Sequence, residues 1–378
     1  MKTPALPTIT WEQALTWRLH RHGLDVRSAD LDLMEMTERL CGVHAQVLSC
    51  AELMLAIRVG DQTMQSVRSA LWDQHALVKT WVMRGTLHLL TSRSLPRYAA
   101  TMHAGPIYWT ADGVTVTEQD VRLVASAVGT VLRGRVMTRA ELAGALCAEL
   151  ARPDLAEVLT HGSGPLLKPA ALAGDLCFGA DRGRNVTFTH PADWAAQAWA
   201  QRPPAPAAAQ QAVLRDFLFG YGPSLPKDIQ RWWGTTRLPI THTRADLGDE
   251  VAEVCVEGRT CWLLHRDLES VRALAPSRRI RLLGGFDQYT VTLPQRVEAL
   301  LPKAARPLVY RTAGWISPVV TAGPAIVGVW RAPQRASDPL QVRLLRPLDA
   351  GERAQLTEEA ALVAGLLHTS PELAIESG

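Results

Sequence analysis

Three stretches of the chain repeat one pattern, in which segments with helical spacing precede two β-rich runs joined by a short turn. The paired runs lie at residues 77–83 and 86–90, 176–179 and 185–189, and 251–256 and 260–264. Two β-rich runs around a glycine-containing turn predict a β-hairpin. Helices followed by a hairpin are the outline of a winged helix, so the chain is predicted to contain three of them in tandem. The repeats are too dissimilar to be recognised by self-comparison alone.

The helices before these hairpins are marked by apolar spacing and by capping residues. Residues 10–22 place Trp11, Ala14, Leu15 and Leu19 on one side, as in an amphipathic helix. Further helices are predicted over residues 63–72, 117–132, 138–150, 153–160, 208–218 and 226–233. The helices at 117–132 and 138–150 each open with a threonine, a residue type that caps helix N-termini.

From Arg278 onward the pattern changes. Short β-rich runs alternate with glycine and proline at residues 280–283, 289–293, 308–310, 316–320, 326–330 and 342–345. These runs predict a small antiparallel barrel or sheet, closed by a helix over residues 350–367. The predicted fold class is α+β.

A length of 378 residues is too great for one ordinary core and predicts two to four domains. The proline- and alanine-rich run at 203–207 has the composition of a linker. Four domains are therefore predicted: a first winged helix over 1–112, a second over 113–202, a third over 203–275, and a C-terminal β domain with its closing helix over 276–378.

Composition excludes several classes of protein. A content of 47% hydrophobic and 20% charged residues describes a soluble globular chain. The N-terminus lacks a basic segment followed by an apolar one, and no apolar run reaches the ~18 residues of a membrane span, which predicts a cytoplasmic protein without a membrane partner. The six cysteines are scattered without a Cys-x-x-Cys pair, which argues against a structural zinc or iron–sulfur site. No metal or cofactor is expected.

One short motif places polar side chains in an otherwise apolar run. His44 and Gln46 lie two residues apart between two segments with helical spacing. Gly42 offers a helix stop, so the His-Ala-Gln triplet is predicted at a junction between two buried helices. A buried polar pair must be hydrogen-bonded or it costs stability. Taken locally, the pair has the pattern of a hydrogen-bonded core histidine with a capping glutamine.

Basic residues gather around the predicted hairpins, although the net charge of +3 is only weakly basic. A winged helix places one helix in a DNA groove and its hairpin on the backbone. The candidates for contact with DNA are Arg18, Arg21, Lys79, Arg84, His88, Lys168, Arg182 and Arg184. Each alone is typical of a solvated surface charge, and His88 equally of a structural histidine, but their clustering favours double-stranded DNA as the partner.

Several sequence blocks follow one another in a recognisable order. They are the triplet, residues 79–88 (KTWVMRGTLH), 166–169 (LLKP), 183–188 (GRNVTF), 231–234 (RWWG), 286–289 (FDQY) and 314–318 (GWISP). With these blocks the chain resembles the winged-helix DNA glycosylases of the AlkZ and YcaQ type, bacterial enzymes that excise alkylated bases, including bulky adducts and interstrand crosslinks. The resemblance implies three tandem winged helix-turn-helix domains with a C-terminal antiparallel β-barrel.

The resemblance also implies a catalytic site. The family's motif is Gln-apolar-Gln or Gln-apolar-Asp, and it corresponds here to His44-Ala45-Gln46, with histidine in place of the first glutamine. His44 is then the candidate to take a proton from water, and Gln46 to orient that water or face an oxocarbenium-like transition state. The triplet holds no lysine, so no Schiff-base step is expected. The expected activity is that of a monofunctional, metal-free hydrolase that releases N7-alkylguanine-type bases in base excision repair.

Two other functions stay open on the sequence. One is a winged-helix regulator that has lost catalysis and binds undamaged DNA, and the other is a sensor that binds adducts without excising them. A single-chain tandem arrangement without a separate dimerisation helix weighs against the regulator and favours a monomer associated with the nucleoid. In the family a C-terminal hairpin lies near the DNA, and residues 316–330, turning at 321–323, are the candidate here. Asp287 and Tyr289 are interpreted as structural.

Overall fold

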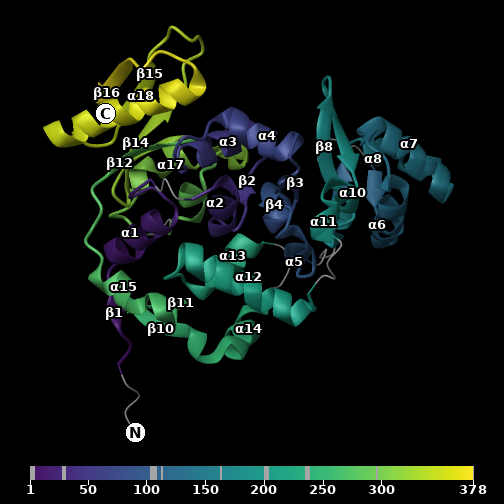
Figure 1. Ribbon diagram of the computed structural model, residues 1–378, viewed down its shortest axis with the longest axis horizontal. Coiled ribbons are helices and arrows are strands. Elements are labelled where there is room, and N and C mark those ends of the chain that lie inside the picture. The colour runs from purple at the N-terminus through teal and green to yellow at the C-terminus, as the bar shows by residue number, and fades with distance from the viewer. Residues whose placement is uncertain are drawn as a thin grey trace. The chain divides into compact units, whose positions relative to one another are not determined.

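The computed structural model describes residues 5–27, 31–102, 109–111, 114–161, 164–199, 204–234, 239–294 and 297–377. The chain forms two compact units, whose elements are labelled in Figure 1. The first unit runs over Met1–Val67, Arg215–Ile229 and Arg244–Gly378, and the second over Arg68–Leu214 and Gln230–Thr243. The four-domain division drawn from the sequence is finer than this and stays a prediction.

In the second unit, two of the predicted hairpins form one sheet. The first hairpin is β3 (Leu77–Trp81) with β4 (Leu87–Thr91), and the second is β8 (Cys177–Arg182) with β9 (Asn185–Thr189), both antiparallel. Strand β3 pairs with β8 at Lys79 and Phe178, and the short β7 (Met137–Thr138) pairs with β9. The two hairpins are confirmed, and the sheet order β4-β3-β8-β9-β7 joins them.

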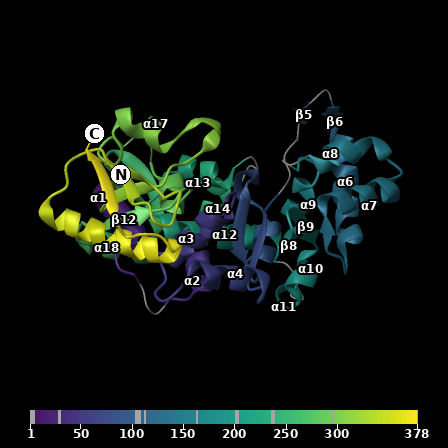
Figure 2. The ribbon, with the colours of Figure 1, turned by 90° about the horizontal axis from the view of Figure 1, so that it is seen from above.

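The helices of this unit begin where their caps predict. Thr117 accepts a hydrogen bond from the Asp120 amide at the start of α6 (Glu118–Leu132), and Thr138 accepts one from the Glu141 amide at the start of α7 (Arg139–Leu150). Figures 1 and 2 show these two helices beside α8 (Ala156–Thr160). The remaining elements are α5 (Leu95–Ala99), β5 (Trp109–Ala111), β6 (Val114–Val116), α9 (Lys168–Ala173), α10 (Pro191–Trp194) and α11 (Ala196–Trp199), together with α4 (Met64–Trp72), which begins in the first unit and ends in the second. Apolar residues of α6, α7 and α9 cover the buried rings of Trp81, Phe178 and Phe188.

The first unit contains the third predicted hairpin. Strands β10 (Val251–Val256) and β11 (Arg259–Leu264) pair antiparallel, and β1 (Thr8–Ile9) adds to β10 in parallel. Helices α1 (Trp11–Arg21) and α15 (Leu268–Ala273) pack together beside this sheet. The remaining helices before the C-terminal sheet are α2 (Leu33–Arg39), α3 (Leu48–Ala56), α12 (Pro206–Tyr221), α13 (Pro226–Trp233) and α14 (Ile240–Leu247), of which the last three cross the boundary between the units.

The C-terminal sheet is open, so the barrel predicted from the resemblance is wrong. Its five strands are β12 (Ile280–Leu283), β13 (Val319–Ala322), β14 (Ala325–Arg331), β15 (Leu340–Leu344) and β16 (Leu373–Ser377). They follow one another in the sheet in this order, and β12 and β16 at the two ends do not pair with each other. The strand β16 pairs in parallel with β15, so the sheet is also not wholly antiparallel.

Two runs predicted as strands are short helices. Residues 289–293 overlap α16 (Gln288–Thr292), because Asp287 caps that segment by accepting a hydrogen bond from the Tyr289 amide. Residues 308–310 overlap α17 (Arg306–Val309), which has proline in its first turn, a position that favours helix initiation. The closing helix is confirmed as α18 (Ala350–Leu367), which packs on β12.

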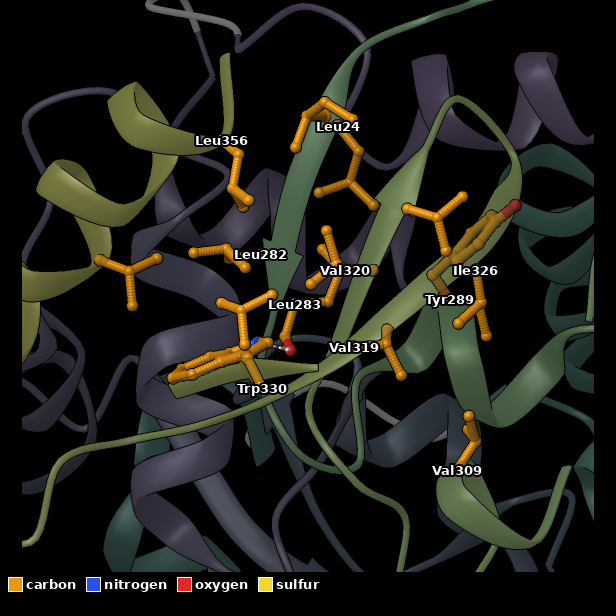
Figure 3. Close-up of a cluster of buried hydrophobic side chains, with 14 of the residues drawn as sticks. Leu24, Leu282, Leu283, Tyr289, Val309, Val319, Val320, Ile326, Trp330 and Leu356 are labelled. Atoms are coloured by element: carbon orange, nitrogen blue, oxygen red, sulfur yellow. Dashed lines mark hydrogen bonds between the residues drawn. The ribbon is translucent and has the colours of Figure 1, made fainter. Parts of the chain in front are cut away.

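The core of the C-terminal sheet gathers side chains from distant parts of the chain. Figure 3 shows Leu282, Val320 and Trp330 of the sheet beside Leu24 and Leu356, which come from the segment after α1 and from α18. The Trp330 indole donates a hydrogen bond of 2.8 Å to the Leu283 carbonyl, which satisfies its one polar group inside this core. Within the part of the chain that the structure describes, no helix is long and apolar enough to cross a membrane.

Candidate active site

The His44-Ala45-Gln46 triplet lies in the turn between two helices, as the sequence predicts. Helix α2 ends at Arg39, and Cys41 and Gly42 then adopt left-handed backbone angles with φ of 53° and 86°. The Gly42 amide closes the helix by donating to the Thr37 carbonyl at 2.9 Å. A two-residue strand, β2 (Val43–His44), and Ala45 to Val47 then lead into α3. The triplet is therefore held on a short turn with a fixed entry and exit.

The two polar side chains of the triplet differ in exposure. His44 is only 7% exposed and Ala45 is fully buried, whereas Gln46 is exposed. The imidazole of His44 stacks on the ring of Phe286, with centroids 5.0 Å apart and planes inclined by 20°. Phe286 also contacts Trp315, whose ring meets it edge-on at 4.9 Å and remains 44% exposed. A row of three rings thus leads from His44 to the surface.

Phe286 is held by the segment around it. Its φ of 57° is uncommon for a bulky residue and requires support from the surroundings. The following residue, Asp287, forms a bidentate ion pair with Arg58 at 2.7 and 2.8 Å, and both side chains are completely buried. Arg58 lies just after α3 and also donates to the Met54 carbonyl at 2.8 Å. The ring that packs on His44 is therefore tied to the helix that follows the triplet.

A second bond ties the same segment to the triplet itself. The Gln288 side-chain amide donates to the Gly42 carbonyl at 2.7 Å, two residues before His44. Gln288 thus contacts the backbone of this turn, and Phe286 contacts the His44 ring. The interpretation of Asp287 as structural agrees with this geometry, because both of its oxygens are occupied by Arg58 and one also accepts from the Tyr289 amide.

Other ionisable groups near this turn are held neutral. Burial, with a smaller contribution from Asp287, raises the pKa of the Cys50 thiol to about 11, so that it is not a thiolate nucleophile near neutral pH. His22 is fully buried among Tyr221 and Tyr289, and burial, reinforced by the charges of Arg58 and Arg18, lowers its pKa well below the usual range. Neither group supplies a charge to the site at neutral pH.

Two candidate DNA contacts in the first unit have hydrogen-bond or ion-pair partners within the protein. Arg18 is 3% exposed, and its guanidinium donates to the carbonyls of Thr292 and Tyr221. Arg21 forms an ion pair of 2.7 Å with Asp267 and lies over the rings of Trp17 and Phe219. Burial removes Arg18 from contact with a DNA strand, which corrects its assignment from the sequence. The guanidinium of Arg21 contacts Asp267 and these two rings.

The candidates on the first hairpin all have contacts within the second unit. Arg84 has a φ of 58°, donates to the Trp232 carbonyl at 3.0 Å and lies 3.3 Å from His88 Nε2. His88 is fully buried, with Nδ1 3.0 Å from the Thr86 carbonyl, so it positions Arg84 and cannot itself contact DNA, which corrects its assignment from the sequence. Lys79 is half-buried, with its ammonium 5.2 Å from the centre of the Phe178 ring.

The candidates of the second block lie on different elements. Lys168 begins α9, and partial burial lowers the pKa of its ammonium. Arg182 is exposed on β8 and pairs with Glu141 at 2.9 Å. Arg184 is exposed in the turn between β8 and β9. Arg182 and Arg184 thus lie on the second hairpin, and Lys168 on the helix before it.

One glycine explains how two of the sequence blocks come together in the second unit. Gly234 ends the block at 231–234 with a φ of 104°, and a Cβ added to it would lie 2.4 Å from the Arg84 backbone. We expect Gly234→Ala to destabilise the second unit by about 1–3 kcal/mol, because the new methyl group adds both strain and a backbone clash. The free energy of unfolding in denaturant measures this effect.

The matched control lies in the same unit. Gly144 is exposed within α7, and a Cβ there meets nothing within 4 Å. Gly144→Ala should raise stability by about 0.5–1 kcal/mol, because alanine is the better helix former. Equal effects of the two substitutions would contradict the close approach of Gly234 to Arg84.

Four residues of the site carry no assigned role on the sequence alone: Arg58, Phe286, Gln288 and Trp315. Phe286 and Gln288 belong to the block at 286–289 and Trp315 to the block at 314–318. The sequence therefore marks these three residues, but it does not show which residues they contact. No local pattern marks Arg58, whose role depends on Asp287 across 229 positions of sequence. The described residues contain no group of three or more His, Cys, Asp or Glu side chains arranged to hold a metal ion.

Comparison with known proteins agrees with the blocks along the sequence. A family model described as DNA glycosylase AlkZ-like matches residues 37–366. An interstrand DNA cross-link repair glycosylase from Streptomyces sahachiroi is 39% identical over 329 residues, which cover 85% of this chain and 87% of the relative. The structure of the Streptomyces sahachiroi DNA glycosylase AlkZ is similar with a TM-score of 0.88 and 36% identity, over 98% of this chain and 100% of that one. The likeness therefore covers both sequence and fold.

Proposed function

Because the chain belongs to the AlkZ-like DNA glycosylase family, we propose that it hydrolyses the N-glycosidic bond of alkylated purines in duplex DNA. Enzymes of this kind are hydrolases that act on DNA, and the Streptomyces sahachiroi relative is named for the repair of interstrand crosslinks. The proposed substrates are therefore N7-alkylguanines, extending to bulky adducts and crosslinks, in base excision repair by a monomeric enzyme. The observation that carries the proposal is the His44-Ala45-Gln46 turn, supported by Phe286 and Gln288.

The proposed chemistry requires little from the protein. A guanine alkylated on N7 carries a positive charge and leaves as a neutral base, and the transition state has oxocarbenium character. His44 accepts a proton from the attacking water, and the carbonyl of Gln46 orients that water or faces the developing charge. Stacking on Phe286 restricts rotation of the His44 ring, which favours one geometry for proton acceptance. The exposed Gln46 is accessible to a DNA strand.

The proposed DNA contacts are the basic residues that the structure leaves near the surface. They are Lys79 and Arg84 of the first hairpin and Lys168, Arg182 and Arg184 of the second block. Guanidinium and ammonium groups bind phosphates without regard to sequence, which suits an enzyme that must find damage anywhere. Residues 316–330 include the antiparallel pair β13 and β14, and the contact of this hairpin with DNA stays a prediction.

The direct test is the product. The enzyme is incubated with duplexes that carry one lesion, in a series from N7-methylguanine to bulky N7 adducts and a crosslink. Alkali-labile abasic sites should form much faster with the enzyme than in its absence, where the charged base is lost slowly by spontaneous hydrolysis. Sequence-specific binding of undamaged DNA without abasic product would instead indicate a regulator, and preferential binding of adducts without product would indicate a sensor.

The role of His44 can be read from the pH dependence of single-turnover excision. Only a neutral imidazole accepts a proton, so the rate should rise with pH through the titration of His44 and then level off. His44→Gln places the family's usual residue at this position, and it should flatten the profile while retaining part of the activity. A flat profile for the wild type would show that His44 only orients groups by hydrogen bonding.

A further inference from the structure

A cavity of about 590 Å³ opens on the C-terminal sheet of the first unit. Its charged and aromatic lining residues are Arg311, Trp315, Trp330, Arg331, Arg343 and Glu376. None of these residues belongs to the catalytic triplet or to the basic residues around the hairpins. Three guanidinium groups and one carboxylate give the lining an excess of two positive charges.

Two of these arginines come from adjacent strands and share one face of the sheet. In the pairing of β14 with β15, Val329 lies opposite Arg343 and Arg331 opposite Gln341. Alternate residues of a strand point to the same face, and directly paired residues share that face. Trp330, between Val329 and Arg331, is 2% exposed because its indole enters the core on the other face. The strand register therefore places Arg331 and Arg343 on the same face of the sheet, opposite the core that contains Trp330.

The third arginine is placed by a tight turn. Tyr310 and Ile316 pair as an isolated bridge, and the Arg311 amide donates to the Trp315 carbonyl at 2.8 Å. Ala313 and Gly314, with φ of 54° and 72°, reverse the chain between them. Arg311 and Trp315 thus stand at the base of one exposed turn, at the edge of the cavity.

Among the described residues, these three arginines have no partner of opposite charge. All three side chains are exposed, and among the described residues none of these side chains forms a hydrogen bond or an ion pair. Two other exposed arginines of the same unit have carboxylate partners, in the pairs Arg272–Glu269 and Arg346–Glu352. Glu376 pairs through its backbone with Arg343 but is too far for an ion pair and leaves the excess of positive charge in place.

Trp315 connects this cavity with the active site. It lines the cavity, is 44% exposed, and contacts Phe286, which stacks on His44. Free guanidinium groups bind phosphate oxygens, and an exposed indole offers a surface on which a base stacks. We infer that this cavity binds a DNA strand beside the scissile nucleotide, with Arg311, Arg331 and Arg343 on its phosphates and Trp315 against a base. The assignment rests on the proposed function and adds to it named phosphate and base contacts on the C-terminal sheet.

The test uses the full-length protein and undamaged oligonucleotides, single-stranded and duplex, in fluorescence polarisation over a range of salt concentrations. Arg331→Gln combined with Arg343→Gln should weaken binding roughly tenfold at low salt and reduce the slope of log K against log salt by about 2, one for each phosphate that the variant no longer neutralises. Both side chains are exposed and unpaired, so the variant should unfold at the wild-type temperature. Wild-type affinity and slope in this variant would overturn the inference.

The control variant removes the same charge elsewhere in the same unit. Arg272→Gln with Arg353→Gln changes two exposed arginines outside the cavity, on α15 and α18, and should leave the salt slope unchanged. An equal decrease in affinity in both variants would mean that only net charge matters, and this would also overturn the inference. A third measurement uses polyglutamate with the same number of charges as the oligonucleotide. If it binds as tightly as the oligonucleotide, and if the cavity substitutions weaken its binding equally, the cavity is a general anion site and the inference is overturned.

Binding and excision can fail separately. If the cavity substitutions lower the DNA affinity and the salt slope, but the wild type never forms abasic sites, the cavity is a DNA-binding site and the glycosylase proposal is wrong. If the wild type excises adducts, but the cavity variant binds DNA like the wild type, the glycosylase proposal stands and the assignment of the cavity to DNA binding is wrong. The two proposals are therefore distinguished by one set of measurements.

Discussion

Replacing His44 by alanine should lower the single-turnover rate of base excision by ~10²–10⁴-fold, because a positioned base contributes that much to proton transfer. Gln46→Ala should lower the same rate by roughly 10²-fold, since the attacking water would lose its orientation. The measurement is the formation of abasic sites in a duplex with one N7-alkylguanine, with the enzyme in excess. Wild-type rates in both variants would remove the triplet from the mechanism.

The controls for this experiment are a histidine and a glutamine outside the site. His265 is exposed after β11, and Gln74 is exposed after α4. His265→Ala and Gln74→Ala should excise at the wild-type rate. DNA affinity should be measured for every variant, so that a slower chemical step is separated from weaker binding. A drop in affinity alone would assign the triplet to recognition of DNA.

Breaking the buried Arg58–Asp287 pair should destabilise the first unit by about 3–5 kcal/mol, because the remaining charge would be left unpaired where no water reaches it. Arg58→Met and Asp287→Asn test the two halves. The double variant should be destabilised by less than the sum of the single variants, since neither charge remains. Unfolding in denaturant measures all three, and additive effects would contradict the pairing.

An exposed pair in the same unit provides the comparison. The side chains of Arg272 and Glu269 are 52% and 79% exposed, so Arg272→Met should cost less than about 1 kcal/mol. The Asp287→Asn variant should also excise more slowly, because Phe286 and Gln288 on either side of it contact the turn that carries His44. A stable Asp287→Asn variant with wild-type excision would show that this pair does not support the site.

Local patterns predicted much of the secondary structure. Threonine caps and apolar spacing located α6 and α7, and β-rich runs around glycine turns located all three hairpins, because these signals act between residues close in sequence. The same reasoning failed at residues 289–293 and 308–310. There, short apolar runs with β-branched or aromatic residues suit both strand and helix, and a cap from Asp287 or a proline at the helix start decided for helix.

The closure of the C-terminal sheet could not be read from the order of its strands. Whether a sheet closes depends on pairing between its first and last strands, and here β12 and β16 each have one neighbour. The parallel addition of β16 also escaped prediction, because α18 separates it from β15 and pairing across that distance leaves no local signal.

Burial likewise separated candidates that look alike in the sequence. Arg18 and Arg182 are both basic residues near predicted elements, yet Arg18 donates to backbone carbonyls in the core, whereas Arg182 is exposed on a hairpin. A charged side chain can be buried when the fold supplies acceptors, and those acceptors come from Thr292 and Tyr221, more than 200 residues away.

The sequence by itself determined the turn that carries His44 and Gln46, the hairpins and the ordered blocks that point to the AlkZ-like glycosylases, because each depends on neighbouring residues or on residue identity. Only the tertiary structure decided what supports that turn. Phe286, Asp287 and Gln288 come from more than 200 residues away, Asp287 is fixed there by its ion pair with Arg58, and Trp315 links the turn to an arginine-lined cavity. Such contacts arise when distant segments pack together, and spacing along the chain does not record them.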